Sequence, residues 1–356
     1  MINTWPLWIP VASSIALAWA MLGELGWLSA AALGICLAGA VLAAVHHAEV
    51  VAHRLGEPFG TLVLALAVTV IEASLILSIM MAGGPGIETL ARDTLFAAVM
   101  IICNGVVGIC VLLGGWRHHE QWFRVEGATA GYAALIAMAT LSLVLPVFTT
   151  STPSGTYSDS QLTFAAIASL VLWAVFVFVQ TVRHRDYFLP ARDRENEHVH
   201  AIPPTMTRTW SSFVLLCVCL VSVVGLAKLL SPIIEQAVIA AQAPRTVIGI
   251  TIALIVLLPE TCAAIRAARA NRLQTSMNLA IGSALASIGL TIPVVVVASM
   301  LLEIPLVLGL EPKDLVLLAL TFGVGSITLG TGRTHVMQGA VLMVIFVAFL
   351  FLALVP

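Results

Sequence analysis

The chain has 356 residues, of which 60% are hydrophobic and only 10% are charged, and its net charge is −2. A soluble globular domain carries roughly 45–50% apolar and about 25% charged residues, so a soluble fold of this length would lack a polar surface. The composition therefore excludes an ordinary soluble protein, and no basic run suggests a nucleic-acid partner.

Eleven apolar stretches follow one another along the chain, each close to the twenty residues that a helix needs to cross about 30 Å of hydrocarbon. The predicted spans are 5–23, 26–45, 60–81, 95–115, 128–149, 161–182, 211–231, 245–265, 276–300, 314–331 and 337–355. Continuous runs favour helices, because barrel strands would alternate over shorter segments. The sequence thus predicts an all-α integral membrane protein of about eleven transmembrane helices.

The basic residues divide unevenly between the two sides of these spans. One side receives twelve of the 16 Lys and Arg residues and the other receives four: Arg92, Lys228, Arg245 and Lys313. Cytoplasmic loops carry the excess of Lys and Arg in membrane proteins. We therefore expect a cytoplasmic N-terminus, an external C-terminus and a cytoplasmic position for the one long polar stretch, residues 183–210.

Two carboxylates interrupt otherwise apolar spans. Glu72 lies in ALAVTVIEASLILSI and Glu260 lies in TIALIVLLPETCAAI, whereas the other acidic residues fall in predicted loops or at span ends. A charge at the bilayer centre costs at least ~2.5 kcal/mol on insertion scales, so such a residue is a functional candidate by default. A purely structural ion pair is disfavoured, because no Lys or Arg is predicted in the middle of a span. The two glutamates are therefore the first candidates for a transport site.

The surroundings of the two acids repeat. Glu49 and Glu235 each precede a proline by nine residues, and that proline precedes Glu72 by fourteen residues and Glu260 by sixteen. Glu72 is on the third predicted span and Glu260 on the eighth, an odd separation that makes the two helices antiparallel across the membrane. Such inverted repeats hold their substrate site near the midplane.

The expected organisation has four parts. Residues 1–25 form a leading transmembrane helix, residues 26–182 form a first repeat of five helices, residues 183–210 form a solvated cytoplasmic linker, and residues 211–356 form a second repeat of five helices.

Neutral oxygen-bearing side chains accompany the acids. The fourth span contains Asn104, and the ninth contains Asn278, Ser283 and Ser287. Small residues and serines also serve helix packing, so for the serines packing and cation binding are equally favoured. Pro259, directly before Glu260, lacks an amide proton and is expected to free a carbonyl that can line a cavity.

An all-oxygen environment suits hard cations such as calcium, which takes six to eight oxygen ligands. The six cysteines lie in apolar stretches without a CxxC pair, so neither a disulfide framework nor a zinc site is expected. Protons and a cation would compete for the two carboxylates, because the bare dianion is too costly at membrane depth. That competition by itself produces exchange, and no cofactor is required.

Six segments of the sequence resemble the bacterial calcium/proton antiporters, of the cation/proton exchanger (CAX) branch of the calcium:cation antiporter superfamily. They are residues 46–60, 56–77, 92–101, 257–265, 278–295 and 326–340, among them GEPFGTLVLALAVTVIEASLIL and LLPETCAAI. Thr69 to Ile71 and Leu257 to Pro259 stand where eukaryotic members commonly carry a Gly-Asn pair before the glutamate.

The resemblance implies a ten-helix inverted-repeat core preceded by one helix, in a bacterial inner membrane. It also implies that the cation is held by one glutamate from each repeat and by further oxygens, namely Glu72, Glu260, Asn104 and Ser283 or Ser287. Glu49, Glu57 and Glu235 correspond to the ends of gating helices and an entrance region, and Asn278 joins them as a candidate for the proton path.

Calcium and protons are accordingly the expected substrates, and the lipid bilayer is the expected surrounding. Exchange of sodium or potassium for protons at the same site is the alternative. A channel is disfavoured, because no carbonyl-filter segment or ring-forming acidic motif is present. An enzyme is disfavoured, because the histidines near HHE (118–120) form no HExxH or serine-based constellation.

Overall fold

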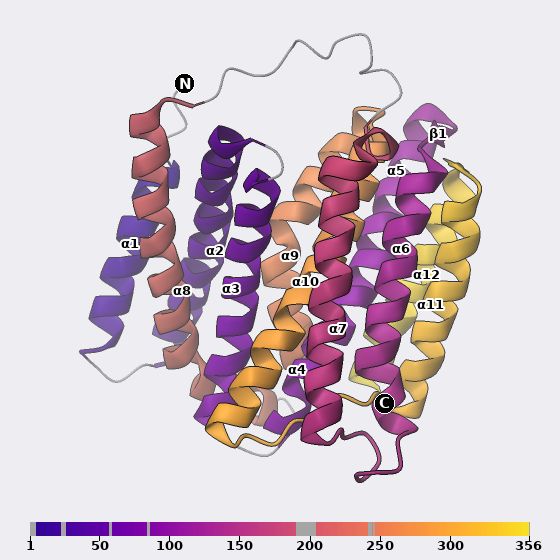
Figure 1. Cartoon of the computed structure of the whole chain (residues 1–356). Helices are drawn as coiled ribbons and strands as arrows, with labels where there is room; N and C mark the ends of the chain where they lie inside the picture. The colour runs from indigo at the N-terminus through magenta and orange to yellow at the C-terminus, as the bar shows by residue number, and fades with distance from the viewer. Residues whose placement is uncertain are drawn as a thin grey trace. The chain divides into compact units, whose positions relative to one another are not determined.

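The computed structural model describes residues 5–22, 26–56, 59–83, 86–189, 204–240, 244 and 246–355. Within these residues the chain forms eleven helical segments (Figure 1). The first three are α1 (Trp5–Ala20), α2 (Trp27–Leu55) and α3 (Phe59–Ala82). The fourth is the continuous segment Ile87–His118, made of η1 (Ile87–Thr89), α4 (Leu90–Met100), the π-helix η2 (Ile101–Val106) and α5 (Val107–His118). The other seven are α6 (Val125–Ala139) with η3 (Thr140–Val144) and η4 (Leu145–Val147), α7 (Asp159–Phe178) with η5 (Val179–Arg183), α8 (Met206–Ala240), α9 (Thr246–Arg269), α10 (Leu273–Leu302), α11 (Pro312–Gly330) and α12 (Val336–Leu354). A short η6 (Arg185–Tyr187) follows η5, and two short strands are β1 (Gln121–Trp122) and β2 (Arg333–Thr334).

Nine of the described segments are long and apolar enough to cross a membrane, and Trp5–Ala20 and Ala65–Met81 are shorter apolar helices. The prediction of an all-α membrane protein with about eleven helices is therefore confirmed.

The predicted span limits are too short in three places. Helix α2 continues to Leu55 and α8 covers Met206–Ala240, where hydropathy predicts ends at residues 45 and 231. A helix of 29 residues is about 44 Å long, so its polar end reaches past a hydrocarbon core of about 30 Å. The fourth segment begins at Ile87 rather than residue 95, which brings Arg92 and Asp93 inside a helix.

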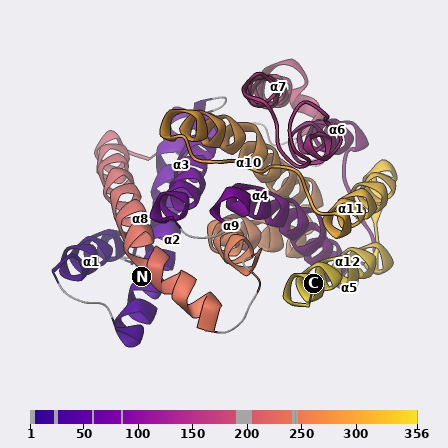
Figure 2. The same ribbon diagram turned by 90° about the horizontal axis from the view of Figure 1, so that it is seen from below.

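The described chain divides into two compact units. The first unit (residues 1–87 and 200–256) contains α1, α2, α3, α8 and the first half of α9. Here α2 packs against α8, α3 and α1, and α8 also contacts α3 and α1, as Figure 2 shows. Two polar contacts join α1 to its neighbours: Ser14 Oγ lies 3.0 Å from Ser222 Oγ, and His47 Nε2 lies 2.8 Å from the carbonyl oxygen of Pro6.

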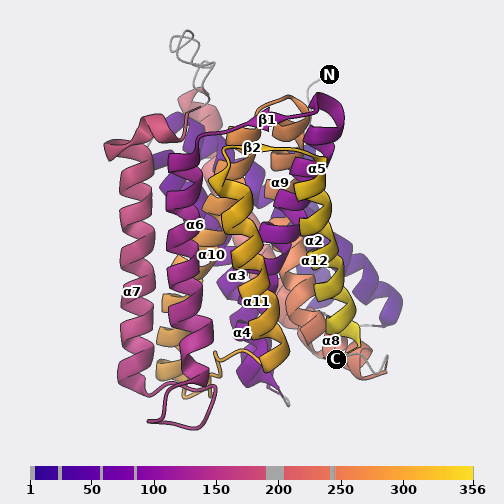
Figure 3. The same cartoon turned by 90° about the vertical axis from the view of Figure 1, so that its right-hand side faces the viewer.

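The second unit (residues 88–199 and 257–356) contains the remaining helices and both strands. Helix α10 packs against α7 and α6, and α12 packs against α5 and η2 (Figure 3). Glycines allow the close approach of α5 and α12. A Cβ on Gly339 would lie 2.5 Å from the amide nitrogen of Leu112, and a Cβ on Gly115 would lie 2.8 Å from that of Val336. Small residues at helix contacts are typical of membrane proteins.

Backbone hydrogen bonds tie the connections at each end of the second unit. At one end, β1 pairs antiparallel with β2, with Gln121 opposite Thr334 (Figure 3). At the other end, the amide of Gly309 donates to the carbonyl of Gly155 over 2.9 Å, and the amide of Val307 donates to the carbonyl of Glu88 over 2.8 Å. Connections that are distant in sequence therefore close both ends of this unit.

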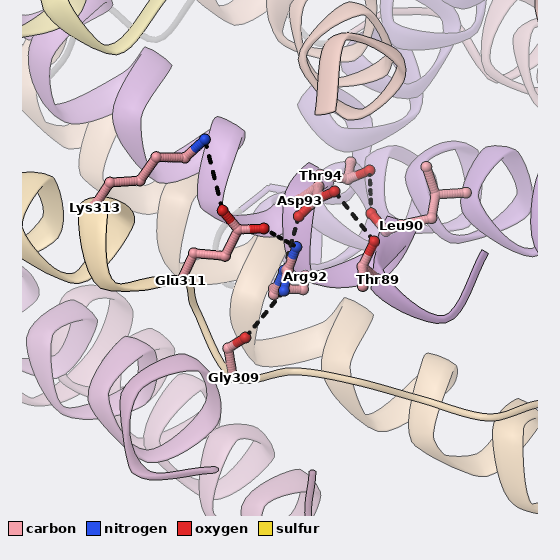
Figure 4. Close-up of polar contacts among 8 residues, drawn as sticks. All are labelled: Thr89, Leu90, Arg92, Asp93, Thr94, Gly309, Glu311 and Lys313. Atoms are coloured by element: carbon pink, nitrogen blue, oxygen red, sulfur yellow. Dashed lines mark hydrogen bonds and ion pairs between the residues drawn. The ribbon is translucent and has the colours of Figure 1, made fainter. Parts of the chain in front are cut away.

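A cluster of ion pairs lies beside the second of these ends, with Arg92 and Asp93 buried and Glu311 exposed (Figure 4). Arg92 Nε donates to Asp93 Oδ1 over 2.8 Å, Nη1 donates to the carbonyl of Gly309 over 3.2 Å, and Nη2 lies 3.6 Å from Glu311. Lys313 contacts the other carboxylate oxygen of Glu311. Arg92 and Asp93 are both buried, and each compensates the charge of the other. This pairing explains why two charged residues can be buried inside the helical segment Ile87–His118.

Candidate cation-binding site

Glu72 lies near the middle of α3, in the first unit, and its residue surface is only 3% exposed. It is the only charged residue of the helix Phe59–Ala82. Thr69 precedes it by one helical turn, so both side chains project from one face of α3. The Thr69 hydroxyl is buried and has no hydrogen-bond partner among the described residues. Glu72 and Thr69 therefore place three oxygens on one helix face.

Glu260 lies in the half of α9 that belongs to the second unit, and it is half-buried. Helix α9 continues through Pro259 without a break. Because proline has no amide proton, the carbonyl of Ile255, four residues earlier, receives no helical hydrogen bond from position 259. The chain passes from the first unit to the second between Val256 and Leu257, within the same turn of helix. Glu260 directly follows this proline in α9.

Asn104 lies in η2, the π-helical turn between α4 and α5, and it is completely buried. π-Turns inside α-helices are rare and occur frequently at functional sites. Its Nδ2 donates to Thr321 Oγ1 on α11 over 2.9 Å. Its Oδ1 is buried and accepts no hydrogen bond from the described residues. A buried amide oxygen of this kind is suited to bind a cation.

Ser283 and Ser287 are four residues apart on α10, and Thr291 continues the same interval. Ser283 is half-buried, whereas Ser287 and Thr291 are buried. Helix α10 packs against η2, the turn that carries Asn104. The structure therefore brings together the elements that carry the neutral candidate ligands of the second unit.

The remaining candidates differ in their surroundings. Asn278 is engaged in structural contacts, since its Nδ2 donates to the carbonyl of Phe188 over 2.6 Å and its Oδ1 accepts from Gln274 over 2.9 Å. Glu49 is exposed on α2. Glu235 belongs to α8, and nothing further is described of its side chain. Glu57 lies outside the described residues.

Two hydroxyl residues were not among the predicted candidates. Thr69 could have been found from its spacing of three residues to Glu72, and Thr291 from its spacing of four residues to Ser287. Each adds a neutral oxygen to a helix that already carries a candidate ligand. Carboxylate, amide, hydroxyl and carbonyl oxygens are each donors of the kind that hard cations prefer.

The family model described as sodium/calcium exchanger protein matches residues 25–182 and 211–355. Among curated proteins, the chain is 51% identical over 324 residues to the protein y4hA of Sinorhizobium fredii, covering 90% of this chain and 87% of that protein. It is 34% identical over 310 residues to the sodium-potassium/proton antiporter ChaA of Escherichia coli, covering 86% of this chain and 83% of that protein.

Among solved structures, the fold is similar to that of native YfkE, with a TM-score of 0.75. The superposition covers 99% of this chain and 100% of that chain at 16% sequence identity. A second structure of the same protein describes it as a Ca2+/H+ antiporter. At this identity the likeness establishes the fold, and the helices that carry the candidate residues follow the same architecture.

Proposed function

Because the chain belongs to the sodium/calcium exchanger family, we propose that it is a secondary active transporter that exchanges a cation for protons by alternating access. Its family comprises transporters rather than enzymes. The observation that carries the proposal is Glu72, a carboxylate that is 3% exposed on a helix without any basic residue. A buried carboxylate in a membrane span is retained for an ion or proton pathway rather than for stability.

In this proposal Glu72 and Glu260 bind either a cation or protons. Two negative charges at membrane depth are too costly to remain bare while the site changes its exposure from one side to the other. The site therefore changes sides only when it is loaded, with a cation in one direction and with protons in the other. Strict exchange follows from this restriction, and no energy source besides the proton gradient is required.

The two halves of the chain act as inverted repeats, residues 26–182 and 211–356, with a leading helix (1–25) and a linker (183–210). Reciprocal contacts support this arrangement. The connection after the third helix of repeat one contacts the end of α9 in repeat two, where Gln121 Nε2 donates to the carbonyl of Ala268 over 2.9 Å. Conversely, the connection after the third helix of repeat two contacts the turn before α4, through Val307 and the carbonyl of Glu88.

The connections between the fourth and fifth helices are equally reciprocal. In repeat two this connection contains β2, which pairs with β1 of repeat one. In repeat one it contains Gly155, which accepts the hydrogen bond of Gly309 from repeat two. The helix contacts are reciprocal in the same way. In each repeat the third helical segment packs against the fifth helix of the other repeat, because α5 packs against α12 and α10 packs against α7. A pseudo-two-fold axis in the membrane plane produces such paired contacts.

Calcium is the proposed cation, and sodium or potassium is the second candidate. Calcium is favoured by the oxygen donor set, which includes Glu72, Glu260, Asn104 and the hydroxyls of α10. The monovalent cations are favoured by the 34% identity to a sodium-potassium/proton antiporter. The same two carboxylates serve in either case, and the transported ion decides how many neutral oxygens are used.

The proposed orientation places the N-terminus in the cytoplasm of a bacterial cell and the C-terminus outside the inner membrane. The distribution of Arg and Lys supports it, because twelve of the 16 basic residues fall on one side of the predicted spans. The bacterial relatives support the inner membrane as the location.

Everted membrane vesicles provide the test. Respiration acidifies their interior, and a pH-sensitive dye reports the gradient while calcium, sodium and potassium are added in turn. We expect one of these ions to dissipate the gradient in vesicles with the native protein, with a rate that saturates. Glu72→Gln and Glu260→Gln should abolish the response at unchanged protein levels in the membrane.

Glu126→Gln is the matched control, since Glu126 is an exposed carboxylate in the first turn of α6. Full exchange in this variant separates the loss of a binding group from the loss of any negative charge. No response to any of the three cations in the native protein would refute proton-coupled antiport. Failure of both Gln variants to insert would show that the two glutamates are structural.

A further inference from the structure

Thr321 holds the amide of Asn104 in one orientation. It lies on α11, is completely buried, and its Oγ1 is 2.9 Å from Asn104 Nδ2, although the two residues are separated by 217 positions in the sequence. Thr321 Oγ1 also donates to the carbonyl of Leu317 over 2.8 Å. A hydroxyl group has a single proton, so a hydroxyl that donates to Leu317 can only accept from Asn104.

The rest of the surroundings favours the same orientation. The Asn104 amide has two N–H groups, and the second contacts Met100 Sδ at 3.8 Å. Turning the amide over would direct its oxygen toward the hydroxyl and would bury two N–H donors without a good acceptor. A single buried oxygen without a hydrogen bond is less costly than two buried donors. The nitrogen therefore faces Thr321, and Oδ1 is the atom that is left to bind a ligand.

Thr321 is itself held in place. The phenol group of Tyr132 on α6 donates to the backbone carbonyl of Thr321 over 2.9 Å. The ring of Tyr132 packs edge-to-face on Phe322, with the ring centroids 5.9 Å apart. Helix α11 is thus fixed against α6 at the residue that contacts Asn104.

We propose that Thr321 is a positioning residue for cation binding, which orients Asn104 so that its Oδ1 serves as a ligand of the transported cation. This inference rests on the proposed function, because it assigns to Asn104 the role of a cation ligand. Residues that orient a metal ligand without touching the metal typically change metal affinity 10–100-fold when they are replaced.

The test measures the cation concentration for half-maximal exchange in everted vesicles, with the ion to which the native protein responds. Thr321→Val keeps the shape of the side chain and removes the hydroxyl. We expect it to raise the half-maximal concentration about tenfold and to leave the maximal rate within about twofold. Thr321→Ser restores the hydroxyl and should return the native value. Thr321→Ala removes the hydroxyl with less bulk, and it replaces the valine variant if that variant does not insert.

An Asn104→Ala background separates positioning from a general effect on stability. Once Asn104 is absent, Thr321→Val should change the half-maximal concentration no further. Thr328→Val, at another buried threonine of α11, should behave like the native protein. A native value in Thr321→Val and Thr321→Ala, or an equal change in the Asn104→Ala background, overturns the inference while antiport stands. Absence of exchange in the native protein overturns both.

Discussion

The amide of Gly309 donates a 2.9 Å hydrogen bond to the carbonyl of Gly155, so that a connection of one half of the chain lies directly on a connection of the other half. The contact is closer than a side chain permits. A Cβ on Gly309 would lie 2.5 Å from Gly155 Cα and 2.9 Å from Val147 Cγ2. The same backbone passes Arg92, whose Nη1 donates to the Gly309 carbonyl. The close backbone contact at this end of the second unit therefore requires glycine at position 309.

We expect Gly309→Ala to lower the free energy of unfolding by about 1–3 kcal/mol, because the added methyl group must displace backbone atoms in a packed contact. Thermal unfolding of the detergent-purified protein, followed by tryptophan fluorescence, measures the effect. The control is Gly323→Ala on α11, where an added Cβ meets no atom within 4 Å. Equal melting temperatures for the two variants would contradict the close contact.

Arg92→Met should leave the buried carboxylate of Asp93 without its counter-charge. Breaking a buried ion pair from one side typically costs about 3–5 kcal/mol, whereas replacing both partners by apolar residues is often neutral. We therefore expect a large loss of thermal stability in Arg92→Met and recovery of most of it in the double variant with Asp93→Leu.

Arg333→Met provides the comparison for that experiment. Arg333 lies 3.9 Å from Glu120 in an exposed pair, which should contribute less than about 1 kcal/mol. A loss of stability in Arg92→Met no greater than that in Arg333→Met would show that the buried Arg92–Asp93 pair contributes no more to stability than the exposed pair.

The proposed orientation predicts opposite labelling of two exposed positions. Ser154 lies in the connection between α6 and α7, and Thr205 directly precedes α8. In a variant without the six native cysteines, a membrane-impermeant maleimide should label Ser154→Cys in intact spheroplasts and Thr205→Cys only in everted vesicles. The reverse pattern would place the N-terminus outside.

Glu49→Gln should lower the rate of exchange without abolishing it. Glu49 is exposed on α2, so its charge can attract cations or protons toward the site but is not required for their binding at membrane depth. Initial rates in everted vesicles, compared with those of Glu72→Gln, give the answer. A native rate would remove Glu49 from the mechanism, and a complete loss would place it among the binding groups.

The sequence by itself determined the approximate number of helices and the presence of one carboxylate well inside each of two of them. Both follow from a cost that depends only on local composition, because a polar group in hydrocarbon is expensive wherever its partners lie. For the same reason hydropathy located Glu72 and Glu260 without knowledge of their neighbours. The equal spacing of Glu49 and Glu235 to their prolines is likewise a local pattern, and it predicts two repeats from the sequence alone.

Only the tertiary structure decided which polar groups meet. Hydropathy placed Arg92 and Asp93 outside the span, because a single-sequence scale counts each charge separately and cannot anticipate that a 2.8 Å pair shares the cost of burial. The π-turn at Ile101–Val106 carries no local sequence signal. Asn104 and Thr321 meet across 217 residues, a contact that depends on the packing of α11 against η2. Helix formation is a local property of the chain, whereas hydrogen bonds between helices depend on how those helices pack.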